Sequence, residues 1–230
     1  MVAKENDPDV LLMYNDYGLI RDNPSDMDHR EKAILLVSTL IDMGAPVEGL
    51  GVQAHLTPPY LPTPEVILRN LDEIASLGLP IYITELDIET YGNESLHARY
   101  LRDVLTALYS HPSIQGIIQW GFWAEHHWKP DAALYNENWT PRESGLVFEE
   151  LMFNEWETHT KGCTDDKGLL VENCFHGDYR IIARYRNHTI TKETSVLPDT
   201  NNTLIIAFNL KNHPQSFNSV STKIEMEEYT

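Results

Sequence analysis

Strand-like and helix-like hydrophobic patterns alternate over the first two-thirds of the chain. Four short runs rich in Val, Ile and Leu predict buried strands, and apolar residues three or four positions apart predict a helix after each run. Because strands that alternate with helices form parallel sheets, this part is predicted to be an α/β domain. The predicted strands cover residues 10–15, 47–55, 81–87 and 114–122, and the predicted helices cover 28–43, 64–77, 93–110 and 144–159.

One predicted strand ends in two carboxylates. The run from Ile81 to Thr84 is apolar and β-branched, and Glu85 and Asp87 follow it. An ionised carboxyl group at the end of an apolar strand costs free energy unless a partner or a reaction requires it there. Glu85 is therefore the first candidate for a catalytic residue, and an exposed or ion-paired glutamate is the alternative interpretation.

Polar or aromatic residues end the other predicted strands as well. Side-chain alternation places Gln53 and His55 on one face of their strand, and Glu85 and Asp87 on one face of theirs. Active sites of (β/α)8 barrels lie at the carboxyl ends of the strands. A nucleotide-binding sheet would carry a glycine-rich loop after a strand, and this sequence has none there. The sequence therefore predicts part of a TIM barrel.

Four of these segments resemble glycoside hydrolase family 10, which contains endo-1,4-β-xylanases. They are Asn15-Asp16-Tyr17, Gly51-Val52-Gln53-Ala54-His55, Thr84-Glu85-Leu86-Asp87, and Trp120-Gly121 with Trp128 beyond it. The order and spacing match the last four βα units of the family's barrel over about residues 3–160. The resemblance implies a retaining glycosidase that cleaves internal β-1,4 bonds of xylan, or of another β-1,4-glucan, without a cofactor.

The resemblance also implies roles for single residues. Glu85 corresponds to the catalytic nucleophile, His55 to the histidine that hydrogen-bonds it, and Asp87 to the acid that holds this histidine. A retaining glycosidase places its nucleophile about 5–5.5 Å from a second carboxyl group, which protonates the leaving oxygen. The predicted sugar-binding residues are Asn15, Gln53, Trp120 and Trp128, with Tyr17 on the leaving-group side.

The second carboxyl group is not found among these segments. In the family it stands in an Asn-Glu-Pro-like motif at the end of the fourth strand, upstream of all segments present here. Asn-Glu pairs occur at 93–94, 136–137 and 154–155, and none ends a predicted strand. Four βα units are also half of the barrel. We expect a fragment of a longer enzyme that lacks the acid/base; the alternative is a catalytically inactive carbohydrate-binding fragment.

The loop after the last predicted strand departs from the family at Ala124, where relatives carry Asp. The neighbouring Glu125 is the expected partial substitute. His126 and His127 follow, but adjacent histidines lack the i, i+4 spacing of two helical metal ligands. The sequence therefore predicts no metal site, and histidines that face solvent or the sugar.

Composition adds information about partners and compartment. The chain has 35 acidic and 17 basic residues, and its net charge of −18 repels phosphate backbones and anionic membranes. Neither nucleic acid nor a membrane is therefore an expected partner, whereas a polysaccharide is. Glycosylation motifs at Asn93, Asn138, Asn187 and Asn201 predict a secreted glycoprotein. The start of the chain is no signal peptide, so we expect this signal to be lost with the missing part.

Beyond residue 160 the pattern changes to short alternating strands, predicted at 169–175, 179–186, 189–196 and 203–209. They predict a small antiparallel β-sandwich over 161–210, which resembles the tail of some plant and invertebrate family members. Cys163 and Cys174 are candidates for a disulfide that closes a short loop. Residues 211–230 are polar and are predicted to form a disordered tail. The predicted domains are therefore 1–160, 161–210 and 211–230.

Overall fold

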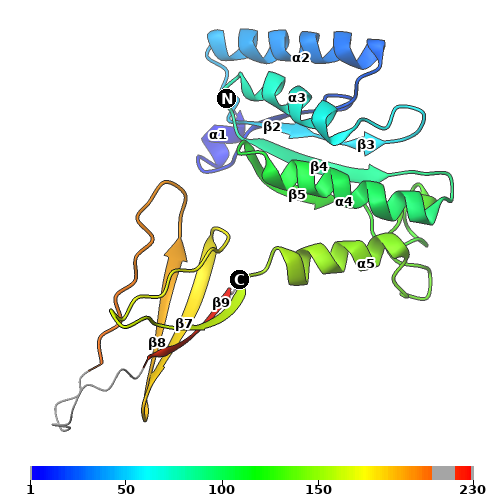
Figure 1. The fold of residues 1–230 in the computed structure, drawn as a ribbon. Coiled ribbons are helices and arrows are strands. Elements are labelled where there is room, and N and C mark those ends of the chain that lie inside the picture. Colours follow the sequence, from blue (N-terminus) through cyan, green and yellow to red (C-terminus); the bar gives the residue numbers. More distant parts are fainter. Residues whose placement is uncertain (1, 209–220, 229–230) are drawn as a thin grey trace. The chain divides into compact units, whose positions relative to one another are not determined.

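The fold is described by a computed structural model that covers residues 2–208 and 221–228 (Figure 1). The chain divides into two compact units, Met1–Glu149 and Glu150–Thr230. The division comes earlier than the predicted boundary at residue 160. The predicted helix over 144–159 is replaced by a shorter α-helix, α5 (Glu143–Glu150), and a π-helical segment, η2 (Leu151–Glu155).

The first unit is an α/β structure with a parallel sheet, as predicted. Strand β1 pairs with β2, both β2 and β3 pair with β4, and β4 pairs with β5, each time in parallel. The strands are β1 (Met13–Asp16), β2 (Gly49–Val52), β3 (His55–Leu56), β4 (Ile81–Ile88) and β5 (Ile114–Gln119). The helices are α1 (Val2–Asn6), α2 (Pro24–Asp42), α3 (Pro64–Ala75), α4 (Glu94–Ser110), the 3-10 turn η1 (Pro130–Ala132), and α5.

Side-chain caps determine where three helices begin. Asn23, Thr63 and Asn93 each accept a hydrogen bond from a backbone N–H two or three residues later. Such a cap satisfies a backbone donor that has no partner inside the helix. Thr63 is the cap of α3. Helix α2 begins before its predicted start because Pro24 occupies the first helical position after Asn23. None of the helices that the structure describes has the length and apolar character needed to cross a membrane.

The core of the first unit lies between the sheet and its helices. Helices α3 and α4 lie side by side against the sheet (Figure 1). Each presents a stripe of buried residues three or four positions apart, the spacing that aligns side chains on one helix face. Burial of one such side chain stabilises the fold by about 1.5–3 kcal/mol. The buried residues are Ile67, Leu71 and Ile74 on α3, Leu101, Val104, Leu105 and Leu108 on α4, and Leu50, Val52, Ile81 and Ile83 on the strands.

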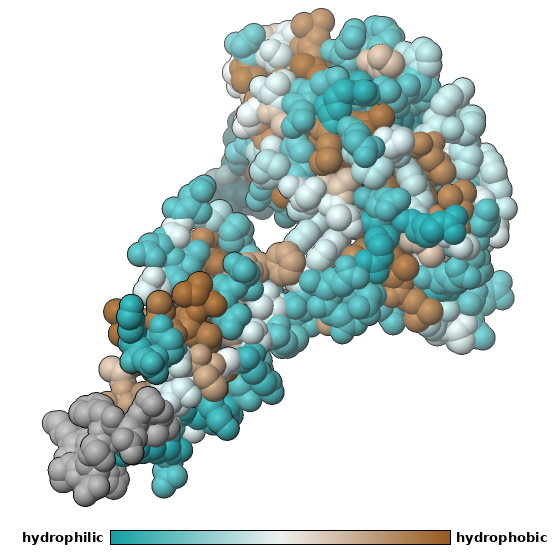
Figure 2. Space-filling model, in the orientation of Figure 1, coloured by the Kyte–Doolittle hydropathy of each residue, from teal (hydrophilic) through white to brown (hydrophobic). Residues whose placement is uncertain are grey.

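The sheet of the first unit is open at both sides. Among the described residues, β1 pairs only with β2 and β5 only with β4. Apolar side chains are exposed at these edges, and Ile118 on β5 is 57% exposed. Figure 2 shows brown apolar patches that interrupt the teal surface. Unpaired edges and bare apolar faces are what further strands and helices cover in a closed barrel. The unit is thus a partial barrel.

The second unit contains one antiparallel sheet with the order β6-β9-β7-β8. The strands are β6 (His159–Cys163), β7 (Gly177–Tyr185), β8 (His188–Val196) and β9 (Lys223–Glu228). The two predicted central strands correspond to β7 and β8. Residues 169–175 and 203–208 form no strand; they place apolar side chains beside a hollow that also borders the sheet. Residue 209 lies outside the described residues.

The predicted disordered tail over 211–230 is wrong at residues 223–228, which form β9 between β6 and β7. Ile224 and Met226 line the hollow beside the sheet, while Lys223 and Glu227 are exposed. This alternation with a period of two is that of a strand with one packed face. Residues 211–220 and 229–230 lie outside the described part of the chain.

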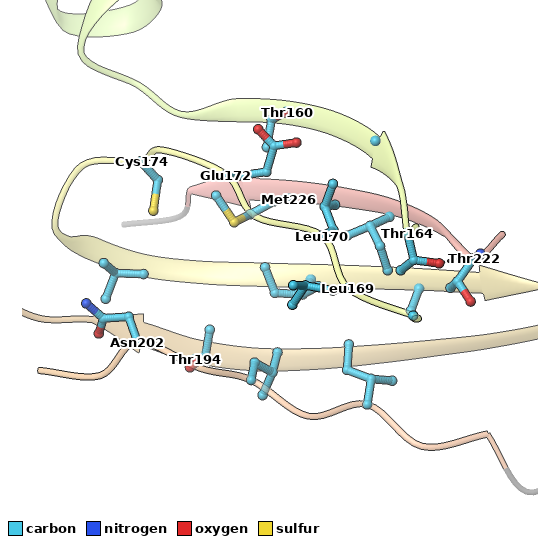
Figure 3. A pocket seen from close by; sticks show the side chains of 18 of the residues that line it. Thr160, Thr164, Leu169, Leu170, Glu172, Cys174, Thr194, Asn202, Thr222 and Met226 are labelled. Atoms are coloured by element: carbon cyan, nitrogen blue, oxygen red, sulfur yellow. Dashed lines mark hydrogen bonds between the residues drawn. The ribbon is translucent and has the colours of Figure 1, made fainter. Parts of the chain in front are cut away.

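The predicted disulfide is not formed, because Cys163 and Cys174 are both free thiols. Alternation along β6 places Cys163 with the exposed Lys161. Cys174 instead borders a hollow of about 590 Å³, where Figure 3 shows its side chain in the same space as Leu170 and Met226. The two thiols therefore face different surroundings. Burial raises the pKa of the Cys174 thiol.

Candidate active site

Glu85, His55 and Asp87 are in contact where β3 pairs with the carboxyl-terminal half of β4. Glu85 Oε2 lies 3.3 Å from His55 Nε2, and Asp87 Oδ2 lies 3.0 Å from His55 Nδ1. The side chains of Glu85 and His55 are each 20% exposed, whereas that of Asp87 is 0% exposed. The three groups therefore form a chain of polar contacts from a buried carboxylate to one that is accessible to a ligand.

Strand register and one unusual backbone angle create this contact. In the pairing of β3 with β4, His55 is opposite Asp87. The strand predicted over 47–55 is broken between β2 and β3, where Ala54 has a φ of 61°. Residues other than glycine rarely adopt this left-handed conformation, which is often found next to functional sites. The turn at Ala54 thus separates His55 from the regular course of β2 and allows it to pair with the end of β4.

Asn15 contacts Glu85 from the end of β1. Its Nδ2 donates to Glu85 Oε1 at 3.4 Å, and its Oδ1 accepts from Thr84 Oγ1 at 2.8 Å. Gly51 is the partner of Asn15 in the strand pairing, and a β-carbon at Gly51 would overlap the Asn15 side chain. A glycine at this position therefore gives Asn15 the space to reach Glu85.

Asp87 has further partners that compensate its buried charge. Trp128 Nε1 donates to Asp87 Oδ2 at 2.6 Å. Lys129 Nζ lies 3.9 Å from Asp87 Oδ1, 3.8 Å from Glu89 Oε2 and 4.5 Å from the centre of the Trp128 ring. A buried carboxylate is stable only with such donors and a counter-charge. Lys129 was not predicted, and its position directly after Trp128 was the only signal in the sequence.

Two tryptophans complete the group around His55. The rings of Trp120 and Trp128 meet the His55 ring edge to face, with centroid distances of 6.4 and 5.1 Å. Both indoles are exposed, so they offer flat apolar surface of the kind that binds sugars. The arrangement thus combines an accessible carboxylate with aromatic walls.

The remaining predicted site residues have other contacts. Tyr17 is exposed, and its ring stacks on that of His29 at a centroid distance of 4.6 Å. The backbone N–H of Gln53 donates to the carbonyl of Asp16 at 3.0 Å. The structure therefore links six of the predicted residues by direct contacts. Tyr17 follows directly after β1 and Gln53 directly after β2, and these two strands are paired. The linked residues are Asn15, His55, Glu85, Asp87, Trp120 and Trp128.

The two histidines after β5 differ from each other. His126 is exposed and packs against Trp123, at a ring distance of 5.2 Å. His127 is buried, and its Nδ1 accepts a hydrogen bond from the backbone N–H of Lys129 at 2.9 Å. Burial lowers the pKa of His127. The prediction that both histidines face solvent or sugar is therefore wrong for His127. Ala124 is buried and Glu125 is exposed, so Glu125 does not occupy the position of Ala124.

Comparison with known proteins gives one family. The sequence profile of glycosyl hydrolase family 10 matches residues 1–149. The anti-sigma-I factor RsgI6 of Acetivibrio thermocellus is 37% identical over 185 residues, which cover 78% of this chain and 22% of that protein. Endo-1,4-beta-xylanase 2 of Arabidopsis thaliana is 35% identical over 179 residues, which cover 78% of this chain and 16% of that protein.

The fold also matches that of a solved xylanase. The crystal structure of native xylanase 10B from Thermotoga maritima superposes with a TM-score of 0.57 and 28% sequence identity. The match covers 66% of this chain and 50% of that chain. The match to each of these three proteins thus covers half of their length or less.

Proposed function

Because this chain belongs to glycosyl hydrolase family 10, we propose that it is part of an endo-1,4-β-xylanase that hydrolyses internal bonds of xylan with retention of configuration. The contact between Glu85, His55 and Asp87 is the observation that carries the proposal. A retaining glycosidase needs an ionised, accessible and firmly held carboxylate as its nucleophile. Another β-1,4-glucan is the alternative substrate.

In this mechanism Glu85 attacks the anomeric carbon while the bond to the leaving oxygen breaks. That oxygen takes a proton from a general acid, and a covalent glycosyl-enzyme forms. Water then attacks the same carbon, gives its proton to the same acid/base group and releases Glu85. His55 and Asn15 each contact one oxygen of Glu85, so they hold its carboxylate in one rotamer for attack.

We propose that the general acid lies in βα units outside this chain. Asp87 is fully buried and accepts from Trp128, so it is not available to a leaving group. The glutamates of the Asn-Glu pairs also lie away from strand ends. Glu94 opens α4, Glu137 lies in the loop after β5, and Glu155 lies in η2. The partial length of the match to the solved xylanase supports a missing half that carries the acid.

A second candidate function is carbohydrate binding without catalysis. The exposed indoles of Trp120 and Trp128 favour it, because they can bind sugar without any acid/base group. In that case Glu85 would hydrogen-bond a hydroxyl instead of attacking an anomeric carbon.

Secretion and glycosylation form part of the same proposal. The asparagines of all four glycosylation motifs, Asn93, Asn138, Asn187 and Asn201, are exposed. Exposure is a requirement for attachment of a bulky glycan. This supports a secreted glycoprotein as the full-length product.

A fluorinated substrate with a good leaving group tests the nucleophile in the 230-residue chain. A 2,4-dinitrophenyl 2-deoxy-2-fluoro-xylobioside expels dinitrophenolate without a general acid, and the fluorine slows the hydrolysis of the covalent product. We expect mass spectrometry to find one adduct on Glu85 and none on Glu85→Gln. Glu89→Gln is the matched control, since Glu89 is a neighbouring carboxylate with similar exposure, and should react like the wild type. Binding of xylohexaose without any adduct would favour the second candidate.

A further inference from the structure

Two tryptophans form a stacked pair in the loop after β5. They lie outside the Glu85 group, by which we mean the six linked residues Asn15, His55, Glu85, Asp87, Trp120 and Trp128. The rings of Trp123 and Trp139 are 4.8 Å apart and nearly parallel, at 17°. Trp139 is 55% exposed, and the exposed ring of Phe122 lies 6.1 Å from it. The pair thus presents a large aromatic surface to solvent at the carboxyl end of β5, the same end of the sheet at which Glu85 lies.

The backbone holds Trp139 in a strained conformation. Its φ is 66°, which is unfavourable for a bulky residue. A tight turn enforces it: Asn138 Oδ1 accepts from the Thr140 N–H at 3.1 Å and from Thr140 Oγ1 at 2.7 Å, and the Trp139 N–H donates to the Asn136 carbonyl at 2.9 Å. The strain does not serve to bury the indole, because more than half of this residue stays exposed. Strain of this kind is often found at binding sites.

The Trp123 ring of the pair is fixed before any ligand binds. Trp123 Nε1 donates to the Glu137 carbonyl at 3.0 Å, and Trp123 forms a β-bridge with Tyr135. The backbone N–H of Ala124 also donates to the Tyr135 carbonyl at 3.0 Å. A rigid aromatic surface loses little conformational entropy on binding, which favours affinity.

A hollow lies beside Ala124 and Asn138, the sequence neighbours of Trp123 and Trp139. The hollow measures about 390 Å³, and its lining includes the amides of Asn136 and Asn138 and the guanidinium of Arg142. Arg142 donates to the carbonyl of Pro130 at 2.9 Å, two residues after Trp128. Pro130 also lines this hollow. Flat aromatic surface beside hydrogen-bonding groups matches a pyranose, which has an apolar C–H face and polar hydroxyls at its edge.

We propose that Trp139, supported by Trp123, forms an additional sugar-binding subsite for a β-1,4-linked polysaccharide chain. It rests on the proposed substrate class and extends it. The subsite takes a sugar unit beyond those at the Glu85 group, so it contributes to long oligosaccharides and not to short ones. A glycan attached to Asn138 is the other source of a pyranose at this place, and the experiment distinguishes the two.

The test compares oligosaccharides of two lengths on the 230-residue chain made in bacteria, which carries no such glycan. We expect Trp139→Ala to weaken xylohexaose binding about 2- to 10-fold, the effect of one aromatic contact, and to leave xylobiose binding unchanged. Trp139→Tyr should restore part of the affinity. Tyr109→Ala removes an exposed aromatic residue from the end of α4 and should have no effect. Calorimetry measures the affinities.

NMR spectra keep the proposal falsifiable if Trp139→Ala does not fold. In the wild-type chain, xylohexaose should shift the indole N–H signals of Trp139 and Trp123. If added xylohexaose shifts the indole N–H signal of Trp128 to a constant end value while the signals of Trp139 and Trp123 do not move, the proposal is overturned. The proposal would also be overturned if these two indole signals are already shifted in a chain glycosylated at Asn138 and do not respond to xylohexaose in the unglycosylated chain. Covalent labelling of Glu85 is a separate readout, so loss of labelling with intact binding would reject the catalytic role and leave the subsite standing.

Discussion

Trp128 Nε1 donates to the same Asp87 oxygen, Oδ2, that lies 3.0 Å from His55 Nδ1. One fully buried carboxylate oxygen thus holds both a predicted sugar-binding indole and the histidine that contacts Glu85. Shared partners couple residues energetically, so changes at these positions are not expected to be additive. Trp128 and His55 therefore form one structural unit around Asp87.

Asp87→Asn tests this unit. The substitution keeps the shape of the side chain but removes the negative charge that faces His55 and Lys129. We expect labelling of Glu85 by the fluorinated xylobioside to slow by about 10- to 100-fold, as for a partner that orients a reactive group. The labelling rate is measured by intact mass spectrometry. An unchanged rate would mean that Asp87 serves the fold alone.

Gly51→Ala tests the position of Asn15. A β-carbon at residue 51 would overlap the Asn15 side chain, so Asn15 must move away from Glu85. Crowding in a packed region costs about 1–3 kcal/mol, and we expect a lower free energy of unfolding together with slower labelling of Glu85.

Gly116→Ala is the matched control for this substitution. Gly116 also lies in a strand of the parallel sheet, but its nearest neighbour, Tyr82 Cδ1, would be 3.4 Å from the new β-carbon. This variant should unfold and react like the wild type in the same urea titration and labelling assay. Equal losses in both variants would contradict the specific role of Gly51.

The sequence predicted the residues whose position follows from strand order. Glu85 and Asp87 lie on one strand, and parallel pairing brings the ends of neighbouring strands together, so His55 and Asn15 could be expected close to Glu85. Lys129 could not be predicted, because it reaches Asp87 from a long loop whose path depends on tertiary contacts. The left-handed conformation of Ala54 could not be predicted either, because alanine carries no local sequence signal for it.

The second unit was harder to predict. Strand β9 has only two apolar residues between charged ones, Ile224 and Met226. Its partner strands are distant in sequence, and pairing over such separations leaves no local pattern. Conversely, residues 169–175 have the alternating pattern of a strand, but they do not form one.

The open edges of the first unit predict the behaviour of the isolated chain. Strands β1 and β5 each have one partner among the described residues, and apolar side chains such as Ile118 are exposed there. We expect no hydrolysis of xylan by the purified 230-residue chain and a broad, weakly cooperative thermal transition. Calorimetry and release of reducing sugar measure these properties. Clear hydrolysis by this chain would contradict the proposal that the general acid lies elsewhere.

The last prediction concerns acid. His97 on α4 is buried, and its Nε2 has no hydrogen-bond partner among the described residues. Burial is the main cause that lowers its pKa from 6.5 to about 4, and the charge of Arg142 acts in the same direction. Asp87 opposes this shift, whereas His127 adds to it. The folded protein therefore binds a proton at this ring less tightly than the unfolded chain does.

Because the unfolded chain takes up the proton first, acid favours unfolding. The contribution of the neutral His97 ring to the free energy of unfolding is complete above about pH 6.5. It is lost as the pH falls towards 4, by about 1.4 kcal/mol per pH unit at most. Urea titrations at pH 7 and pH 5 measure this difference in the free energy of unfolding. His97→Phe should reduce the difference. An equal pH dependence in His97→Phe and the wild type would show that another group causes the acid sensitivity.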